Sequence, residues 1–279
     1  MESLINLDGL SEVLNNLINK VSATVGWVVT HETPSRIAVS TYIQEIQNSA
    51  VDPLTKAALI SQARRNIKEY CNQQDILEIA SQSLKPTAKP NEIEEDWIAQ
   101  FMDKARLVSS SEFQVLWGSI LAEECNVPGS IPRSLLHIME QMDKHMATTF
   151  MSVAAVSIYV GEEEREYAPM INGDSTEEIR KTMGISFDDL IDLQSVGLIE
   201  THFTGIGSGL YFTAEETPVV IRYFDEKYCL PDGKNKFSIG NVIYTRAGQA
   251  LCRSVTPQKK MVFLRNSVFL FGKKKLKRT

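Results

Sequence analysis

Apolar side chains in the first 160 residues recur every three or four positions, which is the spacing of helices that bury one face. The pattern predicts helices over residues 10–30 and 35–48, and a longer helix that begins at Asp52-Pro53. Asp52 is a suitable N-cap, and Pro53 suits the first position of a helix. The sequence therefore predicts an N-terminal helical domain over residues 1–160.

A central pair of helices over residues 92–125 is predicted to organise this domain. Asn91 and Ser109 are each followed three residues later by a glutamate, which is the pattern of a capping box. At helical spacing, large apolar side chains are typical of a core rather than of a base-stacking or cofactor site. These predicted core residues are Trp97, Phe101, Phe113, Leu116, Trp117, Ile120 and Leu121.

Three further expectations complete the helical domain. The stretch 85–90, KPTAKP, carries two prolines and no apparent core residue, so it is predicted to be the connection ahead of the central pair. Asp75 is expected to cap a separate short helix. Asp143 is expected to cap an apolar helix that continues through Ile158.

The composition of the chain changes after Gly161, where short β-prone runs and glycines become frequent. Ser186 with Asp189 predicts a capped helix, and strands are expected at 198–203, 210–213, 219–224 and 237–244. Thr245 is expected to cap a last helix. This order is winged-helix-like, so the predicted fold is mostly α, with a smaller α+β winged-helix-like domain over residues 161–258.

Charge is distributed unevenly along the chain. The net charge is -6, with 29 basic and 35 acidic residues, but residues 259–279 hold eight basic residues and no acid. These are Lys259, Lys260, Arg265, Lys273, Lys274, Lys275, Lys277 and Arg278. Two alternatives stay open for this tail, which also contains apolar residues. It is either a final strand of the second domain, or a contact for nucleic acid or an anionic membrane surface.

The charges of the second domain itself are poorly suited to DNA binding. Residues 175–255 hold eight basic and eleven acidic residues, and the helix expected to enter a groove carries Asp188, Asp189 and Asp192. We therefore predict that this domain serves packing or protein contact. Gly205, Gly207 and Gly209 precede a strand rather than a helix, so they are predicted to form a wing tip and not a phosphate loop.

The sequence contains no clear pattern of a catalytic site or a metal site. The four cysteines form no C-x-x-C pair, and Cys125, His137 and His145 with Glu123 and Glu124 have no compact ligand spacing. The two glutamates are read as a solvated helix end. We predict no metal, no cofactor, no small-molecule substrate and no catalytic residue. The absence of a signal sequence and of a membrane-length apolar run favours the cytoplasm.

Residues 97–142, from Trp97 through a Leu-Trp segment and a Pro-Gly-Ser turn to a leucine-paired helix, resemble the bacterial domain of unknown function 2806 family. The L-W-x-x-[IL]-L-A segment is also similar to abortive-infection alpha type proteins, which would imply phage defence. The first resemblance carries no catalytic residues over to this chain.

The sequence hypothesis is a non-enzymatic bacterial interaction or regulatory protein with a role in antiviral defence. It would act through a protein partner or through self-association. Two alternatives are kept open: a nucleic-acid-binding protein that uses the winged-helix-like domain and the tail, and a protein that attaches to a membrane surface through the tail.

Overall fold

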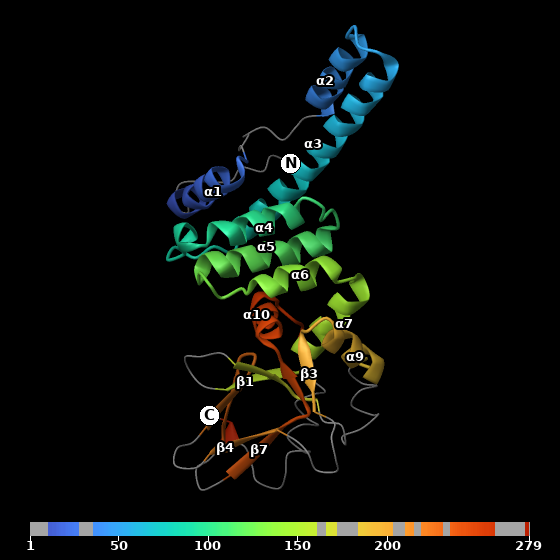
Figure 1. The fold of residues 1–279 in the computed structure, drawn as a ribbon. Helices are drawn as coiled ribbons and strands as arrows, with labels where there is room; N and C mark the ends of the chain where they lie inside the picture. Colours follow the sequence, from blue (N-terminus) through green and yellow to red (C-terminus); the bar gives the residue numbers. More distant parts are fainter. Residues whose placement is uncertain are drawn as a thin grey trace. The chain divides into compact units, whose positions relative to one another are not determined.

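The computed structural model describes residues 11–27, 36–160, 166–171, 184–202, 210–214, 219–230, 235–259 and 277–278. The chain divides into two compact units, Met1–Leu136 and His137–Thr279. As predicted, the fold is mostly α-helical with a smaller α+β part toward the C-terminus (Figure 1). The division lies earlier than the sequence-based boundary at 160, because α7 (Lys144–Ala154) contacts α9 (Phe187–Ser195) in the second unit.

All regular secondary structure described in the first unit is helical. Its elements are α1 (Ser11–Val25), α2 (Arg36–Asn48), α3 (Pro53–Ser81), the 3-10 helix η1 (Pro90–Glu92), α4 (Glu95–Ala105) and α5 (Ser111–Asn126), and α6 (Arg133–Gln141) begins in it. The Asp52 carboxylate accepts the N–H groups of Leu54 and Thr55, as its predicted role of N-cap requires. The most extensive helix contact is between α3 and α5.

Aromatic rings of α4 and α5 form the centre of this unit. Trp97 stacks on Phe101, and Phe101 contacts Trp117, with ring centroids 5.2 Å apart in each pair. The Trp97 indole N–H donates to the backbone oxygen of Ile131 at 3.0 Å. Of the seven predicted core residues, five are buried, whereas Phe113 and Leu116 are only half-buried. The central pair is therefore a packing core.

The helix starts differ from the predicted capping boxes. α4 begins at Glu95 after Glu94, and α5 begins at Ser111 after Ser110, and neither N-cap side chain bonds to the backbone. Asp75 caps nothing, because α3 runs unbroken to Ser81. Tertiary packing of the apolar faces, rather than the local caps, determines where these helices lie.

The connection at 85–90 is attached to the end of α5. The backbone N–H of Lys85 donates to Asn126 Oδ1 at 2.8 Å, and that of Lys89 donates to the Cys125 carbonyl at 2.8 Å. Ala88 and Pro90 are buried, contrary to the expectation that the segment lacks core residues. The segment is an integral part of the first unit.

Glu124 is a buried residue, which corrects its interpretation as part of a solvated helix end. Its two carboxylate oxygens accept the backbone N–H groups of Gly129 at 2.7 Å and Ile131 at 2.8 Å. Burial raises the pKa of Glu124, and these two hydrogen bonds oppose that rise. The side chain fixes the turn between α5 and α6, because it satisfies two backbone donors that would otherwise have no partner there.

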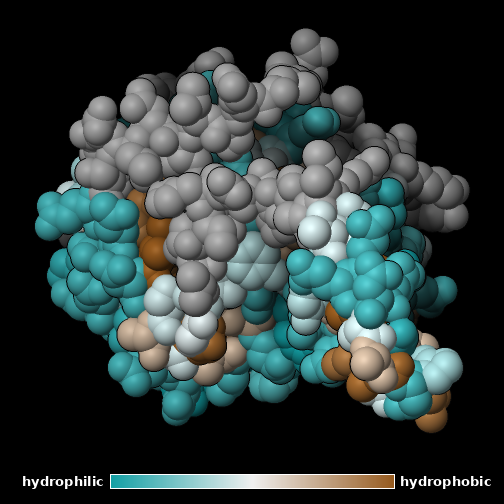
Figure 2. Space-filling model, turned by 90° about the horizontal axis from the view of Figure 1, so that it is seen from above, coloured by the Kyte–Doolittle hydropathy of each residue, from teal (hydrophilic) through white to brown (hydrophobic). Residues whose placement is uncertain are grey.

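The outer half of α3 has few contacts apart from those with α2. The buried residues of α3 lie in its second half, except for Ala63. In Figure 1, α2 and the outer half of α3 extend away from α4 and α5, and we call this pair the arm. Leu54 and Leu59 of α3 and Val51 before it are exposed, and Figure 2 shows a group of apolar side chains on the surface at the lower right.

The second unit combines short strands with helices. Besides α7 and α9 it contains α10 (Arg246–Ser254), β1 (Ser157–Val160), β2 (Glu166–Pro169), β3 (Ile199–Thr201), β4 (Leu210–Ala214), β5 (Val219–Tyr223), β6 (Glu226–Leu230), β7 (Asn235–Gly240), β8 (Val242–Tyr244) and β9 (Lys277–Arg278). The described strands form antiparallel pairs in three sheets, with orders β2-β1-β5-β6-β9, β3-β8 and β4-β7.

The order of helix and strands that the sequence predicts around α9 is present. The helix leads into β3, and β8 returns antiparallel to β3, with Ile199 opposite Tyr244. His202 and Asn241 extend this ladder, because the His202 N–H donates to the Asn241 carbonyl at 2.7 Å and the Asn241 side chain donates to the His202 carbonyl at 2.9 Å. The chain between these two residues carries the pairs β4-β7 and β5-β6.

Two predicted elements of the second unit are wrong in extent. The helix capped by Asp143 ends at Ala154, and Ile158 lies instead in β1 opposite Ala168 of β2. The expected strand over 237–244 is divided into β7 and β8, because Gly240 has a positive φ of 95° that a continuous strand does not permit. A continuous apolar run does not by itself distinguish a buried helix from a buried strand.

Gly118 on α5 is a sensitive point of the α3–α5 contact. A Cβ at this position would lie 2.6 Å from Ile79 Cγ2 and 3.2 Å from the Ala80 backbone nitrogen. We therefore expect Gly118→Ala to lower the free energy of unfolding by about 1–3 kcal/mol, despite the better helix propensity of alanine. Urea denaturation of the two proteins measures the difference.

The adjacent substitution Ser119→Ala provides the control. The Ser119 hydroxyl donates only to the Val115 carbonyl of its own helix among the described contacts, so its loss should change stability by no more than about 0.5 kcal/mol. If Gly118→Ala were as stable as the unmodified protein, the close α3–α5 approach would be disproved.

Candidate functional site

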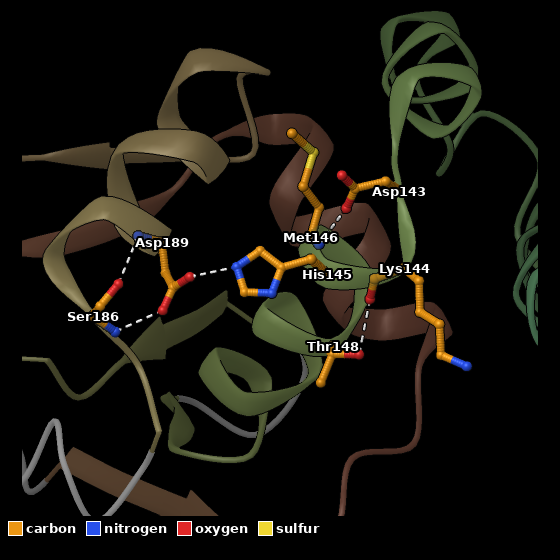
Figure 3. Close-up of polar contacts among 7 residues, drawn as sticks. All are labelled: Asp143, Lys144, His145, Met146, Thr148, Ser186 and Asp189. Atoms are coloured by element: carbon orange, nitrogen blue, oxygen red, sulfur yellow. Dashed lines mark hydrogen bonds and ion pairs between the residues drawn. The ribbon is translucent and has the colours of Figure 1, made fainter.

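A hydrogen-bonded carboxylate joins α7 to α9 in the second unit. His145 Nε2 on α7 lies 2.7 Å from Oδ1 of Asp189 on α9 (Figure 3). The other oxygen of Asp189 accepts the Ser186 backbone N–H at 2.7 Å, and the Asp189 N–H donates to Ser186 Oγ at 3.1 Å. Ser186 and Asp189 thus form the predicted capping box, and His145 adds a bond from the neighbouring helix.

Asp189 is held as a carboxylate by these partners. Burial acts to raise its pKa, but the hydrogen bonds with Ser186 and His145 outweigh burial, so the pKa lies below the ordinary value of 3.8. The acceptor-only charged form satisfies all these donors at once. The carboxylate is therefore an anchor that fixes the start of α9 and its orientation against α7.

The same geometry does not support nucleophilic catalysis. A serine nucleophile must be hydrogen-bonded to the base that activates it. Ser186 Oγ instead accepts the Asp189 backbone N–H, and the His145 ring has Asp189 as its one hydrogen-bond partner among the described residues. The arrangement positions a helix, while the side chain of His145 is 67% exposed.

The outward face of α9 combines acidic and apolar side chains. Asp188, Ile191, Asp192 and Ser195 follow the spacing of one helical face and are all exposed. Phe187 beside them is 46% exposed and Ile191 is 41% exposed. We call these five residues the α9 face.

Asp189 differs in exposure from the other acidic residues of α9, and Ile191 differs from its leucines. Asp189 was grouped with Asp188 and Asp192 as an acid facing a groove, but its carboxylate is turned inward to Ser186 and His145. Ile191 is exposed, since only Leu190 and Leu193 among the apolar residues of α9 are buried. Ile191 and Phe187 thus form a small exposed apolar area bordered by Asp188 and Asp192.

The electrostatics of the α9 face disfavour a phosphate backbone. The helix contains three aspartates and no lysine or arginine. Binding to nucleic acid depends on cations that neutralise phosphates, whereas Asp188 and Asp192 would repel them. The face is chemically suited to a protein surface that offers cations around a shallow apolar area.

The predicted tail contacts are only partly described. Lys259 Nζ pairs with Asp225 at 2.7 Å and Glu226 at 3.3 Å, so this cation is engaged within the second unit. Lys277 and Arg278 form β9, in register with Cys229 and Tyr228 of β6. Lys260, Arg265, Lys273, Lys274 and Lys275, and the proposed wing tip of Gly205, Gly207 and Gly209, lie outside the described residues.

The described ranges of the chain contain neither a candidate metal-binding cluster nor a membrane-spanning helix. In those ranges no group of three or more His, Cys, Asp or Glu side chains could hold a metal ion. Cys125 is buried, and burial raises the pKa of its thiol far above the ordinary value. Within the same ranges, every helix is too short or too polar to cross a bilayer.

The sequence predicts the capping box at Asp189 but not the contact of Asp189 with His145. The Ser186–Asp189 box follows from its local spacing, but no local pattern pairs Asp189 with a histidine 44 residues earlier. That contact depends on how α7 packs against α9. Exposure of Ile191 is likewise a tertiary property, because its sequence position also fits the buried stripe.

Comparison with known proteins gives one match. The sequence model of the family described as "Protein of unknown function (DUF2806)" matches residues 60–267, which is well over half of the chain. No curated protein and no solved structure matches the chain. The predicted similarity to abortive-infection alpha type proteins is not confirmed and stays a prediction.

We expect Asp189→Asn to lower the free energy of unfolding by about 1–3 kcal/mol at neutral pH, because it weakens several hydrogen bonds to a buried charge. The folded-state pKa is below 3.8, so this stabilisation is fully present above that value and is lost as the pH falls through the folded-state pKa. The difference between the two proteins should therefore shrink in acid. Denaturant titrations from about pH 7 to about pH 3 measure it.

The control for this prediction is His145→Gln. The imidazole is largely exposed, so its replacement should cost no more than about 1 kcal/mol. A difference between the aspartate and asparagine proteins that stays constant with pH would contradict the assigned ionised state of Asp189.

Proposed function

The chain belongs to the DUF2806 family of proteins of unknown function, and we propose that it is a non-enzymatic interaction protein that binds another protein through the α9 face. The observation that carries the proposal is the composition of this face. Phe187 and Ile191 are exposed next to Asp188 and Asp192 on one rigidly anchored helix. Apolar side chains bordered by charges are typical of protein contacts.

The anchor at Asp189 supports this role in energetic terms. Because the capping box and His145 hold the helix start, the α9 face needs little further ordering when a partner binds. A preformed surface loses less conformational entropy on association than a flexible one. Even a contact as small as one helix face can then give measurable affinity.

The nucleic-acid alternative receives less support. The helix that would enter a DNA groove, α9, carries aspartates. Lys259 of the tail is already paired with Asp225 and Glu226. The membrane-surface alternative depends on tail residues outside the described ranges and stays a prediction. The proposed role in antiviral defence also stays a prediction, since it came from the abortive-infection resemblance alone.

Site-specific photo-crosslinking tests the proposal. A photoreactive amino acid in place of Ile191 in the full chain should give a discrete protein adduct in cells of the source organism. The adduct should disappear when Asp188→Lys and Asp192→Lys are added, because the partner is expected to offer cations. The control position is Val115, which is also exposed but lies on α5 of the first unit.

Three results would contradict the proposal. The first is the same adduct pattern from Ile191 and Val115. The second is binding of the purified chain to random duplex DNA that weakens at least about tenfold between about 50 and about 200 mM salt and becomes stronger with Asp188→Lys and Asp192→Lys. The third is turnover of a substrate that a point substitution removes.

A further inference from the structure

A second exposed helix face lies on the outer half of α3. Its residues are Leu54, Ala58, Ser61, Arg65 and Lys68, and their alternating spacing of four and three places them on one side of the helix. All five are exposed, and Leu54 is 81% exposed. We call them the arm face. Helix α2 contacts α3, and Ala63 of α3 and Ile46 of α2 are buried, whereas the arm face is exposed.

The arm face is basic in a chain that is otherwise acidic before its tail. Residues 53–68 contain Lys56, Arg64, Arg65 and Lys68 and no acid. Lys56 Nζ donates to the Gln47 carbonyl, but within the described part of the chain no carboxylate pairs with Arg64, Arg65 or Lys68. Arg65 and Lys68 lie near each other on the arm face without a counter-charge and disfavour one another, so an acidic surface is the occupant that this face fits.

The arm face and the α9 face complement each other in charge, shape and length. One offers Arg65 and Lys68 beside small side chains, and the other offers Asp188 and Asp192 beside Ile191. Ala58 and Ser61 leave room for a branched side chain on an approaching helix. The nine residues of α9 extend about 13 Å, and Ala58 to Lys68 spans about 15 Å, at 1.5 Å per residue.

We infer that the partner is a second copy of this chain, and that the arm face of one copy binds the α9 face of another. The inference rests on the proposed function, because it assigns a partner to the same α9 face. The two surfaces differ, so each copy offers one basic surface, the arm face, and one acidic surface, the α9 face. Such contact either closes into a ring of two or more copies or continues as an open chain of copies.

A nucleic acid on the arm face is the competing occupant, and the charges favour the protein. The two cations of the arm face and the neighbouring Arg64 neutralise few phosphates, and the remaining body of the chain is strongly acidic. An acidic helix of a second copy needs only these few cations. Because one helix-on-helix contact is smaller than the roughly 1,200 Å² of a standard interface, the association is weak, reversible and sensitive to salt.

Sedimentation velocity of the full chain at about 10–100 µM tests the inference, at about 50 mM and about 300 mM salt. The unmodified protein should associate at low salt and dissociate at high salt. The variant Arg65→Glu/Lys68→Glu and the variant Asp188→Lys/Asp192→Lys should each be monomeric. Each then carries two surfaces of the same sign, whereas an equimolar mixture pairs opposite signs at both contacts and should recover the association of the unmodified protein.

The mixture makes the test independent of folding defects, because two misfolded variants would not restore each other. Thermal unfolding followed by circular dichroism confirms that each variant is folded. Lys85→Glu/Lys89→Glu is the matched control, with the same change of charge on the first unit outside the arm, and it should leave association unchanged. Lys89 has only an exposed pair with Glu92 to lose.

Several results would overturn the inference. These are a monomeric unmodified protein at low salt, an association that neither charge-reversed variant weakens, a mixture of folded variants that stays monomeric, and duplex DNA binding that Arg65→Glu/Lys68→Glu removes. If self-association fails while the Ile191 crosslink identifies a different protein, the inference is wrong and the proposed function stands. If neither occurs, both are wrong.

Discussion

Buried carboxylates that accept backbone N–H groups determine how both units present their helices. Glu124 satisfies two such donors at the turn between α5 and α6, and Asp189 satisfies one at the start of α9 while also bonding His145. A buried charge is costly unless its hydrogen-bonding capacity is used. Each carboxylate therefore allows one local geometry, and at Asp189 that geometry keeps Leu190 and Leu193 inward.

The exposed face of α9 follows from this constraint. Once Leu190 and Leu193 point into the unit, helical periodicity places Asp188, Ile191 and Asp192 in solvent. The acids keep the apolar residue soluble, and they select against phosphate backbones and other acidic surfaces. The specificity of this face depends on repulsion of the wrong partners as much as on attraction of the right one. The same logic with opposite sign applies to Arg65 and Lys68 on the arm.

Local sequence patterns predicted the helices and strands better than they predicted which residues lie on exposed faces. The caps at Asp52, Asp143 and Ser186 and the central aromatic core follow from spacing alone. The continuation of α3 through Asp75 and the change from helix to strand before Ile158 do not, because packing against neighbouring elements overrides local propensity there. The candidate site was the least predictable part, since the His145–Asp189 contact and the exposure of Ile191 are properties of the packed unit.

The distribution of charge links the two exposed faces. A net charge of -6 conceals a strongly acidic body, a basic tail and a basic stretch of α3. If the arm were solvated only, a cluster of three cations would gain nothing from being placed together, and dispersed lysines would keep it equally soluble. Clustering becomes advantageous when a compact acidic surface approaches, because the charges then act jointly at short range. The α9 face offers such a surface on every copy of the chain, at a local concentration that rises with each copy added to an assembly.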